Sequence, residues 1–111
     1  MPPNASIDLL RGTVDVLILR TLAWDAMHGY GIAQFLRQRT SGTIDIESAA
    51  LYQALHRLEQ KKWVRGWWGV SESNRRARFY ELTAEGRRQL RTQTNDVKAY
   101  ATALVAVLDA K

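Results

Sequence analysis

The spacing of apolar residues changes from a helical to a strand pattern near residue 64 and returns to a helical pattern near residue 83. Residues Val64–Gly69 and Arg78–Leu82 form two short runs rich in aromatic side chains, and the polar stretch Ser71–Arg76 lies between them. This arrangement predicts a β-hairpin with a long, flexible tip. Because a two-stranded hairpin is only marginally stable alone, it must pack against helices.

Three helices are predicted before the hairpin. Apolar residues recur at helical spacing over about Ile7–Trp24 and, for a shorter distance, over Gly29–Thr40. A third helix is expected over about Ser48–Lys61, with Ser48 as its N-cap. The alternation of apolar and polar residues in Thr43–Glu47 predicts one short strand between the second and third helices.

A long helix is predicted over about Ala84–Leu108, with Thr83 as its N-cap. Its apolar and small residues recur at alternating spacings of four and three, which is the pattern of a heptad seam. A second copy of the chain is the simplest partner for this stripe, and the alternative is that the helix folds back onto its own domain. The residues expected in the dimer interface are Leu90, Val97, Tyr100, Ala101, Leu104 and Leu108.

The positive charge of the chain is concentrated in its middle. The formal net charge is +5, and residues 48–91 alone contain ten basic and four acidic residues. A localised basic region is expected on a surface that binds the phosphate backbone of a nucleic acid. Charge alone fits a solvated face equally well.

Several classes of site and location are excluded or disfavoured. The chain has no cysteine, which rules out disulfides and thiolate metal sites and makes the cytoplasm the expected location. Its longest uncharged segment, residues 26–36, is too short to span a bilayer, and no signal peptide is apparent. The two histidines have no carboxylate at ligand spacing, so no metal or other cofactor is expected. No catalytic motif is present, which disfavours an enzyme.

The predicted order of elements is that of a winged helix-turn-helix, a mainly helical α+β fold with a two-stranded wing and a long C-terminal helix. The third helix is the expected reading helix, because the major groove of DNA admits one helix. Gln53 can pair with adenine, and Arg57 can pair with guanine or a phosphate. The wing tip has three arginines within four residues, Arg75, Arg76 and Arg78, which suit a phosphate chain or a narrow minor groove.

The sequence resembles the PadR family of winged-helix transcriptional regulators, in the short form of that family with one C-terminal helix. The motifs that carry the resemblance, in matching order and spacing, are Gly12–Leu19, His28–Ala33, Leu51–Glu59, Asn74–Tyr80 and Leu82–Gly86. By position, the DNA-facing residues that the resemblance implies are Ser48, Ala49, Ala50, Tyr52, Gln53, His56, Arg57, Asn74, Arg75, Arg76 and Arg78.

The resemblance also implies how the protein works. It implies a homodimer that binds a palindromic operator in double-stranded DNA, most often as a repressor, with residues 1–83 as the DNA-binding domain and residues 84–111 as the dimerisation helix. The chain departs from the family at Ala49-Ala50, where the family often has Gly followed by Ser or Thr. A hydroxyl that reaches phosphate is therefore missing. It also has Gln53 where the family often has proline.

Aromatic residues allow two interpretations. Trp63, Trp67 and Trp68 cluster near the base of the wing and are expected to pack the hairpin onto the third helix. The second interpretation is a pocket for a small, flat, apolar effector at the dimer interface, with Trp24 and Tyr100 as its candidate residues. For the chain as a whole, the alternative to a DNA-binding regulator is a winged-helix module that binds a protein or a small ligand. RNA binding ranks last.

Overall fold

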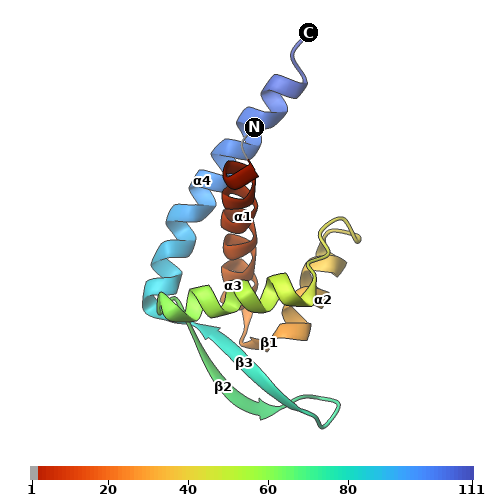
Figure 1. Cartoon of the computed structure of the whole chain (residues 1–111), viewed down its shortest axis with the longest axis vertical. Helices are drawn as coiled ribbons and strands as arrows, with labels where there is room; N and C mark the ends of the chain where they lie inside the picture. Colours follow the sequence, from red (N-terminus) through yellow and green to blue (C-terminus); the bar gives the residue numbers. More distant parts are fainter. Residues whose placement is uncertain (1–2) are drawn as a thin grey trace.

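The computed structural model describes the backbone of residues 3–111 and the side chains from residue 12 onward. These residues fold into four helices and a small antiparallel sheet, which confirms the mainly helical α+β class and the winged-helix order. The elements, shown in Figure 1, are α1 (Pro3–Trp24), β1 (Met27–His28), α2 (Gly29–Arg39), α3 (Ser48–Gln60), β2 (Val64–Val70), β3 (Arg76–Leu82) and α4 (Ala84–Leu108).

The sheet has three strands in the order β1-β3-β2, and the predicted hairpin is its larger part. In the hairpin Val64 lies opposite Leu82, and Trp68 lies opposite Arg78. The strand predicted over Thr43–Glu47 is wrong, because this segment is a loop and the free edge of β3 is paired with β1 instead. Ile44 and Ile46 are half-buried in the loop and pack on the core, which accounts for the alternation that suggested a strand.

The core lies where α1, α2 and α3 meet the base of the hairpin. Its fully buried side chains include Ile18 and Leu19 of α1, Ile32 of α2, and Leu55 and Leu58 of α3. The first half of α4 packs beside α1, while its C-terminal half extends beyond the rest of the domain (Figure 1). Within the described residues, no helix is both long and apolar enough to cross a membrane.

A side chain caps the start of α2 and the start of α4, but not the start of α3. The Nδ1 atom of His28 accepts a hydrogen bond from the backbone N–H of Gly31 at 2.9 Å and so caps α2. Ser48 is the first residue of α3 and not its N-cap, because Glu47 occupies the cap position and makes no side-chain cap hydrogen bond. The N-terminus of α3 therefore keeps N–H groups without a side-chain acceptor at its cap.

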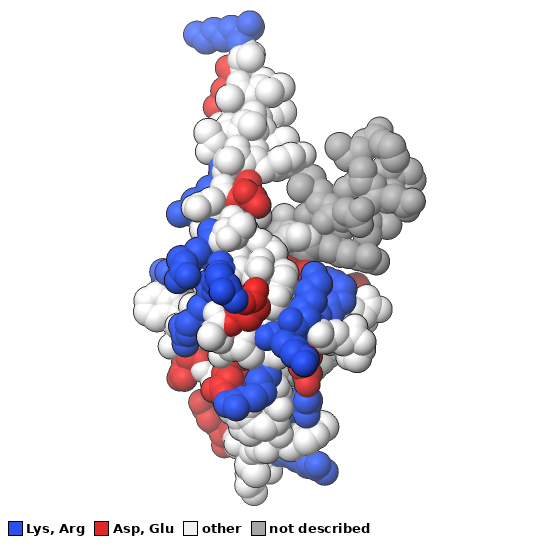
Figure 2. All heavy atoms as spheres, turned by 90° about the vertical axis from the view of Figure 1, so that its left-hand side faces the viewer, with Lys and Arg blue, Asp and Glu red and all other residues white. Residues whose placement is uncertain are grey.

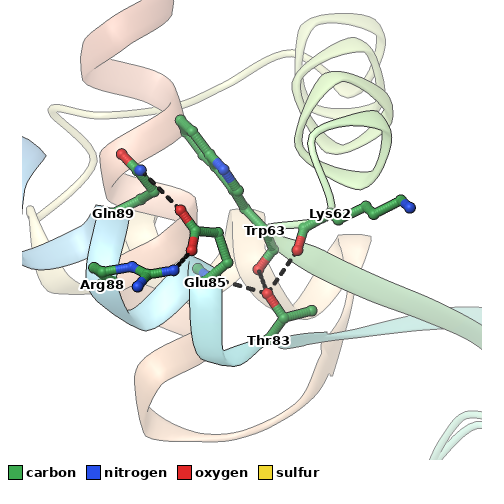
Figure 3. A network of polar contacts seen from close by, with 7 residues as sticks. Lys62, Trp63, Thr83, Glu85, Arg88 and Gln89 are labelled. Atoms are coloured by element: carbon green, nitrogen blue, oxygen red, sulfur yellow. Dashed lines mark hydrogen bonds and ion pairs between the residues drawn. The ribbon is translucent and has the colours of Figure 1, made fainter.

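Thr83 joins the end of α3, the hairpin and the start of α4, as Figure 3 shows. Its hydroxyl donates toward the carbonyl oxygens of Lys62 and Trp63, at 2.6 and 3.1 Å, and accepts a hydrogen bond from the N–H of Gly86 at 3.0 Å. A Cβ at position 86 would lie 2.0 Å from the Trp63 carbonyl oxygen, so only glycine allows α4 to begin this close. The predicted N-cap at Thr83 is confirmed.

Replacing Thr83 by valine is expected to destabilise the protein by about 1 kcal/mol, because the isosteric side chain neither caps α4 nor bonds the carbonyls of the preceding turn. Urea unfolding followed by circular dichroism measures this free energy. Thr83→Ser keeps the hydroxyl and should remain within a few tenths of a kcal/mol of the parent. Equal losses for the two variants would show that packing of the methyl group, and not the hydroxyl, stabilises this junction.

Candidate nucleic-acid interface

The exposed face of α3 carries hydrogen-bonding side chains without formal charge. Leu51, Ala54, Leu55 and Leu58 turn into the core, so the opposite face is left to solvent. The exposed residues of that face are Ser48, Ala49, Ala50, Tyr52, Gln53, His56 and Gln60. An amide at Gln53 and an imidazole at His56, one turn apart on a helix of the width that a major groove admits, can read base edges.

Arg57 does not belong to this exposed face, although the sequence suggested it as a base contact. Its guanidinium donates a hydrogen bond to the carboxylate of Asp15 on α1 at 2.9 Å. The Asp15 side chain is only 9% exposed and that of Arg57 only 29%. In this structure Arg57 therefore bridges α3 to α1. A carboxylate in the otherwise apolar run 14–19 was the available sign that α1 needs a buried cationic partner.

The tip of the wing is a tight turn that exposes cationic side chains. The N–H of Ser71 bonds the carbonyl of Arg75 at 2.8 Å, and the N–H of Asn74 bonds the carbonyl of Ser71 at 2.9 Å. Asn74 has φ +60°, a conformation that asparagine tolerates better than most residues. Arg75 and Arg76 are exposed and form no ion pair within the described part of the chain. They remain available to an anion.

Arg78, the third arginine of the predicted cluster, is turned toward α3. Its guanidinium donates a 2.6 Å hydrogen bond to Glu59, and this bond raises the pKa of Arg78 above its usual value. It also lies over the rings of Trp68 and Tyr80. Burial raises the pKa of Tyr80, which keeps that phenol neutral. A Cβ at Gly66 would come within 2.8 Å of the guanidinium, so Gly66 provides the space for it. Arg78 thus fastens the wing to α3.

The three tryptophans near the hairpin do not act together. Trp63 is half-buried and packs against the core. Trp67 and Trp68 are exposed, so the prediction that they pack the hairpin onto α3 is wrong for these two. Trp67 stacks on Phe79 on one face of the hairpin, with ring centroids 6.0 Å apart, and Trp68 lies on the other face. Neighbouring residues of a strand point to opposite faces, which a shared location in the sequence does not reveal.

A groove of about 390 Å³ lies between α2 and the start of α3. Two acidic residues, Asp45 and Glu47, line it beside Ser48. Arg37 lines the same groove and pairs with Asp45 at 3.9 Å, so it is mainly the negative charge of Glu47 that opposes a phosphate beside Ser48, one of the residues expected to face DNA. Tyr52 also lines the groove and packs closely on α2, because a Cβ at Gly29 would lie 2.7 Å from its hydroxyl oxygen.

The candidate effector residues do not converge within one protomer. Trp24 and Tyr100 are both exposed, and neither lines the groove beside α3. Figure 1 shows the C-terminal end of α1, where Trp24 lies, level with the start of α4. Tyr100 lies about 24 Å farther along α4 at the rise of an α-helix. A pocket that contains both residues therefore needs a contribution from another molecule.

The apolar stripe of α4 divides into a buried and an exposed part. Leu90, one of the residues predicted for a dimer interface, is only 8% exposed and packs in the core of its own protomer, so it has little surface left for a partner. Val97 is half-buried against the same core. Farther along, Tyr100, Ala101, Leu104 and Leu108 are exposed. Figure 2 shows this upper part of the molecule as a surface without charge up to the last turn, while lysine and arginine side chains gather lower down, interspersed with carboxylates.

Comparisons with known proteins agree with this geometry. The model of the transcriptional regulator PadR-like family matches residues 18–92. An uncharacterized protein of Lysinibacillus sphaericus is 31% identical over 83 residues, which cover 75% of this chain and 76% of that protein. A transcriptional regulator from Clostridium thermocellum has a similar structure, with a TM-score of 0.77 and 29% identity over 94% of this chain and 99% of the other. A PadR family transcriptional regulator from Eggerthella lenta gives a TM-score of 0.74 and 26% identity over 97% and 92% of the two chains. The chain therefore belongs to the transcriptional regulator PadR-like family.

Proposed function

We propose that this protein is a sequence-specific DNA-binding regulator that represses transcription as a homodimer on a palindromic operator. One observation carries the proposal. The polar, exposed face of α3 and the arginines of the wing tip belong to one rigid unit, because Arg78 of the wing is bonded to Glu59 of α3. Figure 1 shows the hairpin running back beneath α3, so one duplex can reach both elements.

The contacts that we propose divide by chemistry. Gln53 and His56 read base edges in the major groove, with Tyr52 beside them. Asn74, Arg75 and Arg76 bind the phosphate chain next to that groove. The start of α3 approaches the DNA backbone through Ser48, Ala49 and Ala50, but these residues do not anchor a phosphate there. Arg57 and Arg78 position the reading helix and the wing through Asp15 and Glu59.

The proposed dimer and its operator depend on a division of the chain into two parts. Residues up to 83 form the DNA-binding unit, and the exposed stretch of α4 binds a second copy. A twofold dimer presents two reading helices related by symmetry, which requires a palindromic site. Occupation of such a site beside a promoter excludes the polymerase, which is repression. A flat, apolar effector bound near Tyr100, between the copies and close to the partner's α1, would change the spacing of the reading helices.

A second function, a winged-helix module that binds a protein or a small ligand, is favoured by Asp45 and Glu47. These carboxylates flank the start of α3, where a DNA-binding helix gains from positive potential. Fluorescence anisotropy with a random duplex at increasing salt separates the two functions. DNA binding predicts a logarithm of the association constant that falls linearly with the logarithm of the salt concentration. Weak binding with an association constant that does not change with salt concentration would favour the second function.

Replacing Arg75 and Arg76 together by alanine should make that salt dependence shallower by about 2 per protomer, because each lost phosphate contact removes about 0.9 from the slope. Affinity should fall by similar factors on all duplexes, since phosphate contacts carry no sequence information. Arg65→Ala is the matched control, because Arg65 lies on the same hairpin but pairs with Glu81. If Arg65→Ala changes the slope as much as the double variant, the wing tip is not the phosphate contact.

A further inference from the structure

One face of the wing carries a ladder of alternating rings and guanidinium groups. The Arg78 guanidinium carbon lies 5.9 Å from the centroid of the Tyr80 ring and 5.7 Å from that of Trp68, and the Arg76 guanidinium carbon lies 4.5 Å from Trp68. Tyr80 is buried in the core, and the ladder runs from it toward the tip of the wing. Each ring is attracted to the cations beside it.

The ladder lies on the face of the hairpin that turns toward α3. Strand alternation puts Tyr80, Arg78 and Arg76 on one face of β3, and the bond from Arg78 to Glu59 shows that this face looks toward α3. Trp68 stands opposite Arg78 on the neighbouring strand and therefore shares that face. Trp68 therefore lies on the side of the wing that faces the reading helix, nearer to the wing tip than the part of the hairpin that the core covers.

Trp68 is unusual because, among the described residues, guanidinium groups lie against its ring and yet most of its side chain stays open to solvent. Its side chain is 57% exposed, and its indole N–H has no hydrogen-bond partner among the described residues. A tryptophan that only supports the hairpin packs its ring against the core, as the half-buried Trp63 does. Two guanidinium groups hold the Trp68 ring at the wing surface, so it presents a fixed apolar area and one donor within a cationic setting.

The backbone of a DNA duplex matches this setting group by group. Its deoxyribose rings are apolar and its phosphates accept hydrogen bonds, in alternation along the chain. We propose that Trp68 is the apolar contact of the wing with DNA, with its ring packed on a deoxyribose and its N–H bonded to a phosphate, while Arg76 binds the next phosphate. This inference rests on the proposed function, because it names a further contact within the same interface.

The first test compares Trp68→Ala with Trp67→Ala in anisotropy titrations with a random duplex at several salt concentrations. Trp67 is the matched control, since it is the neighbouring ring on the opposite face of the hairpin. We expect Trp68→Ala to weaken binding about tenfold at every salt concentration, with the slope unchanged, as is typical of losing an aromatic contact. Trp67→Ala should bind within about twofold of the parent.

Two outcomes of this test would overturn the inference. Parental affinity in Trp68→Ala would show that the ring does not contact DNA. A shallower salt slope, like that of the Arg75 and Arg76 double variant, would show that Trp68 acts only by orienting arginines. Thermal unfolding of both variants confirms that the folded protein is compared in each case.

A second test needs no alanine variant. Protein labelled with 5-fluorotryptophan has four fluorine resonances, one for each tryptophan, and each is assigned from its own Trp→Phe variant. Adding duplex should shift the Trp68 resonance and leave that of Trp24, at the end of α1, in place. A stationary Trp68 resonance in a protein that does bind duplex overturns this inference alone. A protein that binds no duplex at any salt overturns the proposed function, and this inference with it.

Discussion

Replacing Arg57 by leucine is expected to destabilise the protein by about 3 kcal/mol, because the change leaves the carboxylate of Asp15 without its partner in a buried position. The Asp15 side chain is only 9% exposed, and the 2.9 Å bond to Arg57 is its sole ion pair within the described residues. The expected loss lies at the lower end for broken buried pairs, since Arg57 itself keeps some contact with solvent. Urea unfolding measures it directly.

A double-mutant cycle shows whether the pair, and not the arginine alone, is responsible. Asp15→Leu combined with Arg57→Leu should recover most of the lost stability, because two apolar side chains replace a buried ion pair at little net cost. A different result would contradict this structural role of Arg57. If Arg57→Leu changes stability by less than about 1 kcal/mol and yet abolishes selectivity among duplexes, Arg57 is a base-reading residue as the sequence first suggested.

Most of the helices and the hairpin were predictable because their signals are local. Each of these signals lies within a short segment of the sequence. Examples are the apolar stripe of a helix that faces the core, the hydroxyl of Thr83 that caps α4, and the switch to strand spacing at Val64. A pattern of about ten residues is enough to predict such a helix or hairpin, whatever the rest of the sequence is. The hydrogen bond by which His28 caps α2 is also local, since its two residues are three positions apart.

The elements that were missed depend on distant partners. β1 has only two residues, too few to show any period, and it exists because Met27 and His28 meet the free edge of β3. The segment containing Ile44 and Ile46 has the alternation of a strand but does not pair with the sheet. Sheet pairing is decided by which edge is open, and a local pattern carries no information about that.

The same reason explains why the candidate site was only partly predictable. Arginines of equal appearance in the sequence separate into two groups in the structure. Arg57 and Arg78 are bound by carboxylates 42 and 19 residues away, while Arg75 and Arg76 are left to solvent. Counting basic residues pointed to α3 and the wing as the candidate interface, but only the folded protein shows which cations an external anion can reach.

Replacing Leu104 by aspartate is expected to convert the proposed dimer into a monomer. Leu104 is 46% exposed at the centre of the uncharged stretch of α4, where a partner helix would have to bury a carboxylate. Thr102→Asp is the matched control, because it adds the same charge two residues away on the opposite side of the helix. Sedimentation velocity at micromolar concentration should give a monomer for Leu104→Asp, and a dimer for both the parent and Thr102→Asp.

The loss of the dimer should also lower DNA affinity by about a hundredfold on a long duplex, because the second reading helix then no longer binds at high effective concentration. The length of the duplex provides the internal comparison. Two half-sites about one helical turn apart are needed to engage both copies, so the parent should prefer a duplex of about 30 base pairs over one of about 12. Leu104→Asp should bind both lengths with nearly equal affinity per site, since a monomer gains nothing from a second half-site. A parent protein that sediments as a monomer, or a variant that keeps the preference for the long duplex, would mean that α4 does not join two copies and that the exposed stretch beyond Val97 binds something else.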